Sequence, residues 1–264
     1  MNTQSRVLGL LLIPLIAGTG YTAEPEAPRL RLLVPAYFYP AGDGWKEWER
    51  LFDSPARPAL AVIVNPASGP GAQADPNYLK VLDRAKKADL LLLGYVTTSY
   101  GKRTAEDVKA DVDRWLHLYP GIQGIFFDEQ ASAADKLEYQ TALYDYVRRE
   151  KKRSLVVTNP GTVCAEEYLS KPALDVGCLF EGPQAKDGFG LPGWVGQHAR
   201  RVAVLSYQVE KAERMQQYVK QAADKGLGYI YVTDAAGANP WDRLPRYWNE
   251  EIAAVQEVNR RKPK

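Results

Sequence analysis

The chain has 264 residues, 45% of them hydrophobic and 25% charged, which suits a globular protein with one large domain or two small ones. Its formal net charge is only +2, so charge gives no reason to expect nucleic acid or an anionic membrane as a partner. The two cysteines, Cys164 and Cys178, could be joined in an exported protein, but a chain this long does not need a disulfide, and no histidine pair lies near them to complete a metal site.

The N-terminus has the order of a secretory signal peptide. Arg6 precedes an apolar run over residues 7–17, and small residues follow it. The run is too short to span a bilayer comfortably; an uncleaved anchor is the alternative. We predict a signal peptide over residues 1–23, a Pro-rich linker over residues 24–29 and one domain over residues 30–264. The mature protein is then expected to be secreted or periplasmic, with no stable membrane insertion.

Eight apolar runs alternate with segments of helical spacing along the rest of the chain. The runs cover residues 30–38, 60–65, 90–97, 122–128, 154–159, 176–181, 202–207 and 228–233. The helical segments cover residues 45–52, 77–88, 105–119, 133–151, 164–169, 194–200, 211–225 and 246–259. Continuous apolar runs indicate strands buried on both faces, and regular alternation with helices indicates parallel pairing.

This count and size are typical of a (β/α)8 barrel, for which ~250 residues is usual. The Gly-x-Gly-x-x-Gly fingerprint of a dinucleotide-binding sheet is absent after the first run. We therefore predict an α/β protein with a single-domain (β/α)8 TIM barrel; an open doubly wound sheet is the alternative.

Polar and aromatic residues stand where the predicted strands end, which is where such barrels place their chemistry. They are Tyr37, Tyr39, Asn65, Tyr95, Thr97, Asp128, Glu129, Asn159, Glu181, Tyr207 and Asp234. Trp194 and Trp241 follow strand ends and could form walls of the same cleft. This set suits a sugar, whose hydroxyls need hydrogen bonds and whose C–H faces pack on aromatic rings.

Two acids in this set are candidates for catalysis. Asp128 ends the fourth strand and Glu181 ends the sixth, and alternate strands share layers in these barrels, so the two could face each other. Glycoside hydrolysis needs such a pair. The alternatives are that Asp128 is a helix N-cap and Glu181 a solvated acid. Glu129 could orient a sugar hydroxyl, change the pKa of Asp128 or cap the next helix.

Other candidates also have plain structural explanations. Asp234 could cap the following segment, and Asn65 and Asn159 each precede a proline and could initiate turns. His117 and His198 lie away from the strand ends and from each other, so we expect no metal site. The Gly-x-Ser-x-Gly motif that presents a nucleophilic serine does not occur either, which disfavours serine-based acyl transfer.

An ordered set of motifs resembles the spherulin-4-like family over about residues 30–235. The motifs are VPAYFYP (34–40), AVIVNP (61–66) with SGPG (68–71), LGYVTTSYG (93–101), GIFFDE (124–129), VTNPG (157–161) and FEG (180–182). The resemblance implies a (β/α)8 glycoside hydrolase with retaining-type relatives. It implies α-1,4-linked galactosamine or N-acetylgalactosamine polymers, such as galactosaminogalactan or Pel, as substrates, and functional acids at Asp128, Glu129 and Glu181.

We therefore expect an exported, endo-acting glycoside hydrolase that binds a polysaccharide, needs no cofactor or metal and is a monomer. Asp128 is expected to be the nucleophile and Glu181 the general acid/base, although the sequence leaves the order of these roles open. The main alternative is a non-catalytic carbohydrate-binding or wall-associated barrel with the same aromatic bowl. A lyase or aldolase is a further alternative, but no strand end clearly supplies its lysine.

Overall fold

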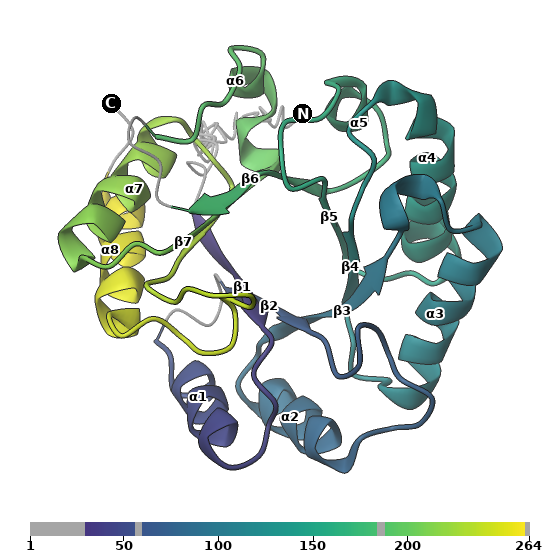
Figure 1. Cartoon of the computed structure of the whole chain (residues 1–264), viewed down its shortest axis with the longest axis horizontal. Helices are drawn as coiled ribbons and strands as arrows, with labels where there is room; N and C mark the ends of the chain where they lie inside the picture. The colour runs from purple at the N-terminus through teal and green to yellow at the C-terminus, as the bar shows by residue number, and fades with distance from the viewer. Residues whose placement is uncertain (1–29, 56–59, 184–187, 262–264) are drawn as a thin grey trace, which may run out of the picture.

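The computed structural model describes residues 30–55, 60–183 and 188–261, and the predicted signal peptide and linker lie outside them. Eight parallel strands close into one barrel, in which each strand pairs with the next along the chain and the eighth pairs with the first. Helices surround this barrel (Figure 1). The predicted (β/α)8 barrel is confirmed.

Strands and helices alternate along the described chain. The strands are β1 (Arg31–Ala36), β2 (Leu60–Val64), β3 (Leu91–Thr97), β4 (Gly124–Asp128), β5 (Leu155–Asn159), β6 (Val176–Pro183), β7 (Val202–Tyr207) and β8 (Tyr229–Val232). The helices are α1 (Asp43–Phe52), α2 (Pro76–Lys87), α3 (Ala105–Leu118), α4 (Leu137–Asp145), α5 (Glu167–Ser170), α6 (Val195–His198), α7 (Ala212–Asp224) and α8 (Trp248–Arg260).

The pattern of burial explains both kinds of element. β2 and β8 are buried along their whole length, because one face of each strand meets the barrel interior and the other meets the helices. The helices bury only one stripe. In α7, for example, the buried side chains are Met215, Tyr218, Val219 and Ala222, which is the spacing of a single helical face.

The strand register brings the fourth and fifth strand ends together. Asp128 pairs with Thr97 of β3 on one side and with Asn159 of β5 on the other. β5 and β6 pair only at Val157–Val176 and Thr158–Gly177, so no ladder joins these two strands at the mouth of the barrel. The polar side chains of β5 and β6 meet there instead.

A β-bulge changes the direction of β6 before it reaches the mouth. Its register against β7 shifts between Cys178 and Phe180, and Glu181 then lies beside Leu205 of β7. A bulge inserts one extra residue and re-aims the side chains that follow it. The placement of Glu181 therefore depends on this irregularity, which no sequence pattern predicted.

Glycine allows α3 to pack closely on β3, next to the strand end. A Cβ atom on Gly94 would lie 2.7 Å from the ring of Trp115. The Trp115 indole is fully buried and donates a hydrogen bond to the carbonyl of Tyr95 at 2.7 Å. This contact fixes the backbone of β3 directly beneath the site.

Two predicted helices differ from the structure. Residues 133–151 form a 3-10 turn (Ala134–Lys136), then α4, then a π-helical turn (Tyr146–Glu150), because the Lys151 N–H bonds to the Tyr146 carbonyl and widens the last turn. The helix predicted over residues 164–169 is shorter and begins later, since α5 covers only Glu167–Ser170 and the Ala165 N–H bonds instead to the Ser132 carbonyl in the loop after β4.

Among the described residues, the helices are all too short or too polar to cross a membrane. Cys164 and Cys178 are both buried and free. Burial raises the pKa of the Cys164 thiol to about 11 and raises that of Cys178 well above its ordinary value. Both thiols therefore stay protonated at neutral pH and serve as packing side chains.

Candidate active site

Asp128 is the last residue of β4, and it does not cap a helix. The next helical turn begins at Ala134, and that turn has no side-chain cap. The N-cap alternative for Asp128 is therefore wrong. Its carboxyl group instead accepts hydrogen bonds from side chains of the two neighbouring strands, β3 and β5.

One amide group joins the two predicted catalytic acids. The Asn159 Nδ2 atom donates to Asp128 Oδ1 at 2.9 Å and to Glu181 Oε2 at 2.5 Å. The side chains of β4, β5 and β6 thus converge at the mouth of the barrel. The structure brings together the pair that the strand ends predicted.

Each acid also has a partner of its own. The Tyr95 hydroxyl donates to Asp128 Oδ2 at 2.8 Å, so both oxygens of Asp128 accept hydrogen bonds. The backbone of Glu129 supplies a further hydrogen bond to Asp128. Glu181 receives its second hydrogen bond from the Trp241 side chain, in the loop after β8.

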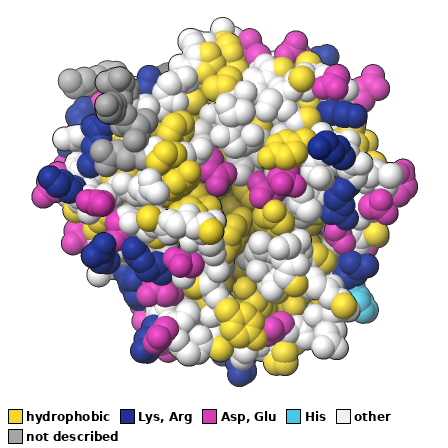
Figure 2. Space-filling model, viewed as in Figure 1, with side chains coloured by type: hydrophobic (Ala, Val, Ile, Leu, Met, Phe, Trp, Pro, Cys, Tyr) yellow, Lys and Arg dark blue, Asp and Glu magenta, His cyan; other side chains and the backbone are white. Residues whose placement is uncertain are grey.

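Burial dominates the electrostatics of this pair. It raises the pKa of both Asp128 and Glu181, and the hydrogen bonds from their partners oppose that rise. The charge of Asp128 raises the pKa of Glu181 further. In Figure 2, acidic side chains lie beside the hollow at the centre of this face, hydrophobic side chains line much of its interior, and most Lys and Arg side chains lie toward the edge. The rim of the hollow therefore carries acidic groups.

The loop after β3 holds Glu129 next to Asp128. Glu129 has a left-handed backbone conformation with a φ of 54°. Its carbonyl accepts hydrogen bonds from the Tyr100 N–H at 2.6 Å and from the Thr98 hydroxyl at 2.7 Å, and its carboxylate accepts one from the Thr97 hydroxyl at 2.5 Å. Such conformations cost ~1–3 kcal/mol each outside glycine and cluster at functional sites. Glu129 is thus fixed at the site rather than at a helix start.

Aromatic rings line the same mouth. Tyr37 packs edge-on against Tyr95, with ring centroids 5.9 Å apart, and Tyr207 packs edge-on against Trp241 at 5.8 Å. Nearby carboxylates, including Asp128 and Glu181, raise the pKa of Tyr37 after burial, which is the largest cause. These rings offer the apolar surface that a sugar ring needs beside acidic groups.

Two residues of the site were not assigned by sequence reasoning. Trp241 was expected only as a wall, and its hydrogen bond to Glu181 joins the loop after β8 to the end of β6. Tyr100 is 51% exposed, and the charges of Glu129, Asp128 and Glu181 all raise its pKa after burial. The sequence did contain an indication of Tyr100, because this residue belongs to the motif at residues 93–101 and lies just after the end of β3.

Two predicted substrate-binding residues make hydrogen bonds near α2, and a contact of either with substrate stays a prediction. The Tyr39 hydroxyl donates to Asp75 at 2.9 Å, at the start of α2. The Asn65 side chain accepts a hydrogen bond from the Gly69 N–H at 2.9 Å, as the turn alternative for that residue expects. The structure therefore places both in the loop system around α2.

Asp234 and Trp194 also have structural partners. Asp234 is almost fully buried and forms ion pairs with Arg243 at 2.8 Å and Arg246 at 2.5 Å. It holds the loop after β8, which carries Trp241, but it does not cap α8. Trp194 precedes α6 and packs against the His198 ring at 6.2 Å. A contact of either residue with substrate stays a prediction.

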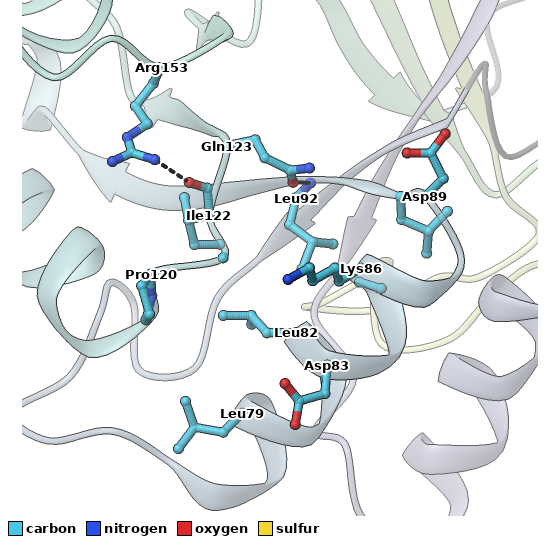
Figure 3. A pocket seen from close by; sticks show the side chains of 13 residues that line it. Leu79, Leu82, Asp83, Lys86, Asp89, Leu92, Pro120, Ile122, Gln123 and Arg153 are labelled. Atoms are coloured by element: carbon cyan, nitrogen blue, oxygen red, sulfur yellow. Dashed lines mark hydrogen bonds between the residues drawn. The ribbon is translucent and has the colours of Figure 1, made fainter.

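A groove of about 730 Å³ lies at the opposite end of the barrel. It is lined by α2 and by residues that precede the strands, such as Gln123 before β4 and Arg153 before β5 (Figure 3). Gln123 accepts a hydrogen bond from the Leu92 N–H, and Arg153 donates one to the Ile122 carbonyl. This end of such barrels serves stability rather than chemistry.

The structure places the two histidines apart. His117 is exposed at the end of α3, and His198 lies 3.2 Å from Glu166. Over residues 30–55, 60–183 and 188–261, no three His, Cys, Asp or Glu side chains are grouped so that they could hold a metal ion.

Comparison with known proteins adds to this geometry. The sequence profile described as spherulation-specific family 4 matches residues 31–255. Spherulin-4 from Physarum polycephalum is 30% identical over 256 residues, covering 90% of this chain and 73% of that protein. The crystal structure of Aspergillus clavatus Sph3 in complex with GalNAc covers 88% of this chain and 99% of its own, with 26% identity and a TM-score of 0.73.

A more distant similarity concerns the fold alone. A chitinase from Rhizomucor miehei matches 87% of this chain and 99% of its own with a TM-score of 0.51, at 11% identity. The family profile and the spherulin-4 similarity both extend over most of the chain, including all eight strands. The chain therefore belongs to spherulation-specific family 4, the spherulin-4 family.

Proposed function

We propose that this protein is an exported, endo-acting glycoside hydrolase that cleaves α-1,4-linked galactosamine or N-acetylgalactosamine polymers with two carboxylates. The observation that carries the proposal is the convergence of Asp128 and Glu181 on one amide nitrogen. A pair of half-buried acids held this closely destabilises the fold, because each carboxylate raises the cost of ionising the other, and such pairs are typical of functional sites.

The spacing of the pair supports hydrolysis with retention of the anomeric configuration. Asp128 Oδ1 and Glu181 Oε2 lie 2.9 and 2.5 Å from the same nitrogen. Their separation cannot exceed the sum of these lengths, which is below the ~6.5–9.5 Å of inverting enzymes and therefore favours the closer spacing of retaining ones. A water molecule does not fit between carboxyl groups this close and the sugar, so direct attack is favoured.

The hydrogen bonds support the assignment of the two roles. Asp128 accepts hydrogen bonds on both oxygens and from the Glu129 backbone, which stabilise its ionised form. This suits a nucleophile. Burial and the nearby charge of Asp128 raise the pKa of Glu181, which suits an acid that must hold a proton until the glycosidic bond breaks.

The reaction then has two steps. The Glu181 carboxyl group donates its proton to the glycosidic oxygen as Asp128 attacks the anomeric carbon; the glycosidic C–O bond breaks, the leaving chain departs with a new hydroxyl, and a covalent glycosyl–enzyme ester forms. Glu181 next takes a proton from water, whose oxygen attacks the same carbon. The bond to Asp128 breaks, and Glu181 is protonated again.

The substrate class is supported by the relative and by the surface of the site. Sph3, the similar protein of known structure, was crystallised with GalNAc. The mouth pairs acids with aromatic rings such as Tyr37 and Trp241. Rings of this kind pack on sugars, and an acidic mouth suits a polymer in which some amino groups are free and positively charged.

The test is product release from purified α-1,4-linked N-acetylgalactosamine polymers of defined acetylation, followed by mass spectrometry. We compare wild type with Asp128→Asn and Glu181→Gln. Matched controls are Asp224→Asn and Glu257→Gln, which replace acids on the outer helices α7 and α8. We expect soluble oligomers from wild type and controls, and a loss of at least ~1,000-fold in both site variants.

Two results would argue against this function. If wild type binds the polymer but releases nothing, the non-catalytic carbohydrate-binding alternative is favoured. If both site variants retain full activity, the chemistry lies elsewhere. Export is proposed from the N-terminal apolar run alone; N-terminal sequencing of the mature protein from the culture medium or periplasm tests it.

A further inference from the structure

Asn159 makes a contact with the acids that a substrate-binding residue would not need. Its amide nitrogen has two hydrogens, and the structure directs one toward Asp128 and the other toward Glu181. We infer that Asn159 is a positioning residue, which holds the two acids at their working separation and does not bind the substrate. This inference rests on the proposed function for its kinetic consequences, but the hydrogen bonds can be tested without it.

The orientation of the Asn159 amide is fixed by a second contact. Its Oδ1 atom accepts a hydrogen bond from the Gly161 N–H at 2.9 Å. A backbone N–H can only donate, so Oδ1 must face Gly161 and Nδ2 must face the acids. Both amide hydrogens are then occupied, and no donor of this side chain is left for a sugar hydroxyl.

The backbone around Asn159 is also held. Its side chain is almost fully buried, with the residue 6% exposed. Its carbonyl accepts a hydrogen bond from the Gln130 N–H at 3.0 Å, which ties the end of β5 to the loop after β4. Pro160 follows and keeps the Asn159 backbone extended. The amide is therefore preorganised between the two acids.

The separation of Asp128 and Glu181 depends on the Asn159 amide more than on the other hydrogen-bond donors to these acids. Tyr95 donates only to Asp128, and Trp241 only to Glu181, whereas Asn159 donates to both. Without it, each acid would lose a donor to its charged form, and no single side chain would bond to both acids and hold them at a fixed separation.

Other titratable groups face the pair and set the background of any titration. They are Tyr37 just after β1, Tyr95 on β3, Tyr100 in the loop after β3, Glu129 just after β4, and Cys178 on β6. The pKa values of the tyrosines and of Cys178 all rise. These four groups therefore stay neutral below about pH 8, and the changes expected for Asn159 variants belong to the carboxyl groups.

The experiment measures the carboxyl groups directly. The side chains of Asp128 and Glu181 are titrated by carbon NMR in wild type and in Asn159→Ala. We expect both carboxyl pKa values to rise in the variant. Asn65→Ala is the matched control for this titration, because Asn65 also precedes a proline and also accepts a backbone N–H, yet bonds to neither acid. It should leave both pKa values unchanged.

Kinetics give the second readout. We expect Asn159→Ala to lower kcat ~100-fold or more, with KM within about twofold of wild type, since misplaced reacting groups affect chemistry rather than uniform binding. The pH optimum should move upward with the two pKa values. If the alanine variant does not fold, Asn159→Ser is used; its hydroxyl is shorter than the amide and has one hydrogen, so it cannot donate to both acids and at least one pKa should still rise.

The outcomes separate this inference from the proposed function. Unchanged carboxyl pKa values in the folded variant would overturn it, whatever happens to activity. A raised KM with unchanged kcat would overturn it too, because Asn159 would then bind substrate. If wild type cleaves no polymer, the proposed function fails, while a rise in both pKa values still supports the bridging role of Asn159.

Discussion

Asp234, whose ion pairs with Arg243 and Arg246 hold the loop after β8, allows a quantitative test of stability. Burial alone would raise its pKa, but hydrogen bonds from Arg243 and Arg246 outweigh burial and lower the pKa from 3.8 to about 2. A shift of this size corresponds to at most ~2.5 kcal/mol of stability at neutral pH. The Arg246 side chain is 81% exposed, so solvent screens part of the attraction. We therefore expect Asp234→Asn to lower the free energy of unfolding by ~1–2 kcal/mol.

The pH dependence of this effect has a definite sign. Because the folded pKa of Asp234 is depressed, its stabilisation is complete above about pH 4 and is lost as the pH falls through about 2. Urea unfolding of wild type and Asp234→Asn at pH 7, with thermal melts between pH 5 and pH 2, measures the difference. Equal stability at pH 7, together with a raised KM, would refute the reasoning and support the predicted contact of Asp234 with substrate.

Three further variants test other parts of the structure. Burial raises the pKa of Glu251 well above 4.5, so its ionisation opposes folding as the pH rises above the pKa of the unfolded chain; Glu251→Gln should raise the melting temperature at pH 7 more than at pH 4. Gly94→Ala should destabilise the fold by ~1–3 kcal/mol in urea, because its new Cβ would press on the Trp115 ring. Tyr95→Phe removes a donor to Asp128; the acid limb of the kcat/KM profile should move to higher pH, and an unmoved limb would exclude Asp128 as the titrating group.

The barrel was predictable because its strands are continuous apolar runs with polar ends. β4 illustrates this, since the run before Asp128 is buried throughout and the acid stands where the strand stops. The same rule found Glu181 on β6. Strand ends of a parallel barrel share one face whatever the lengths of the helices between them, so the rule places such residues without knowledge of the loops.

Strand ends alone do not predict a residue's role where its contacts come from loops or where the strand backbone is irregular. Asp234 stands at a strand end like Asp128, but two arginines that follow it in the chain enclose it. The bulge between Cys178 and Phe180, which aims Glu181, leaves no mark in the hydrophobic pattern. Such contacts depend on the paths of the loops over the barrel and on local irregularities of the strands. The hydrophobic periodicity of the sequence reports neither of them.

The central claim is that Asp128 and Glu181 cleave a glycosidic bond as a closely spaced pair. Proton NMR of the reducing end, recorded in the first minutes of digestion of an α-linked polymer, tests it most directly. Oligomers that first appear as the α-anomer and then mutarotate are the predicted result. First products in the β-anomer would contradict the spacing argument, and the absence of any new reducing end from a folded protein and a bound polymer would contradict the hydrolase assignment itself.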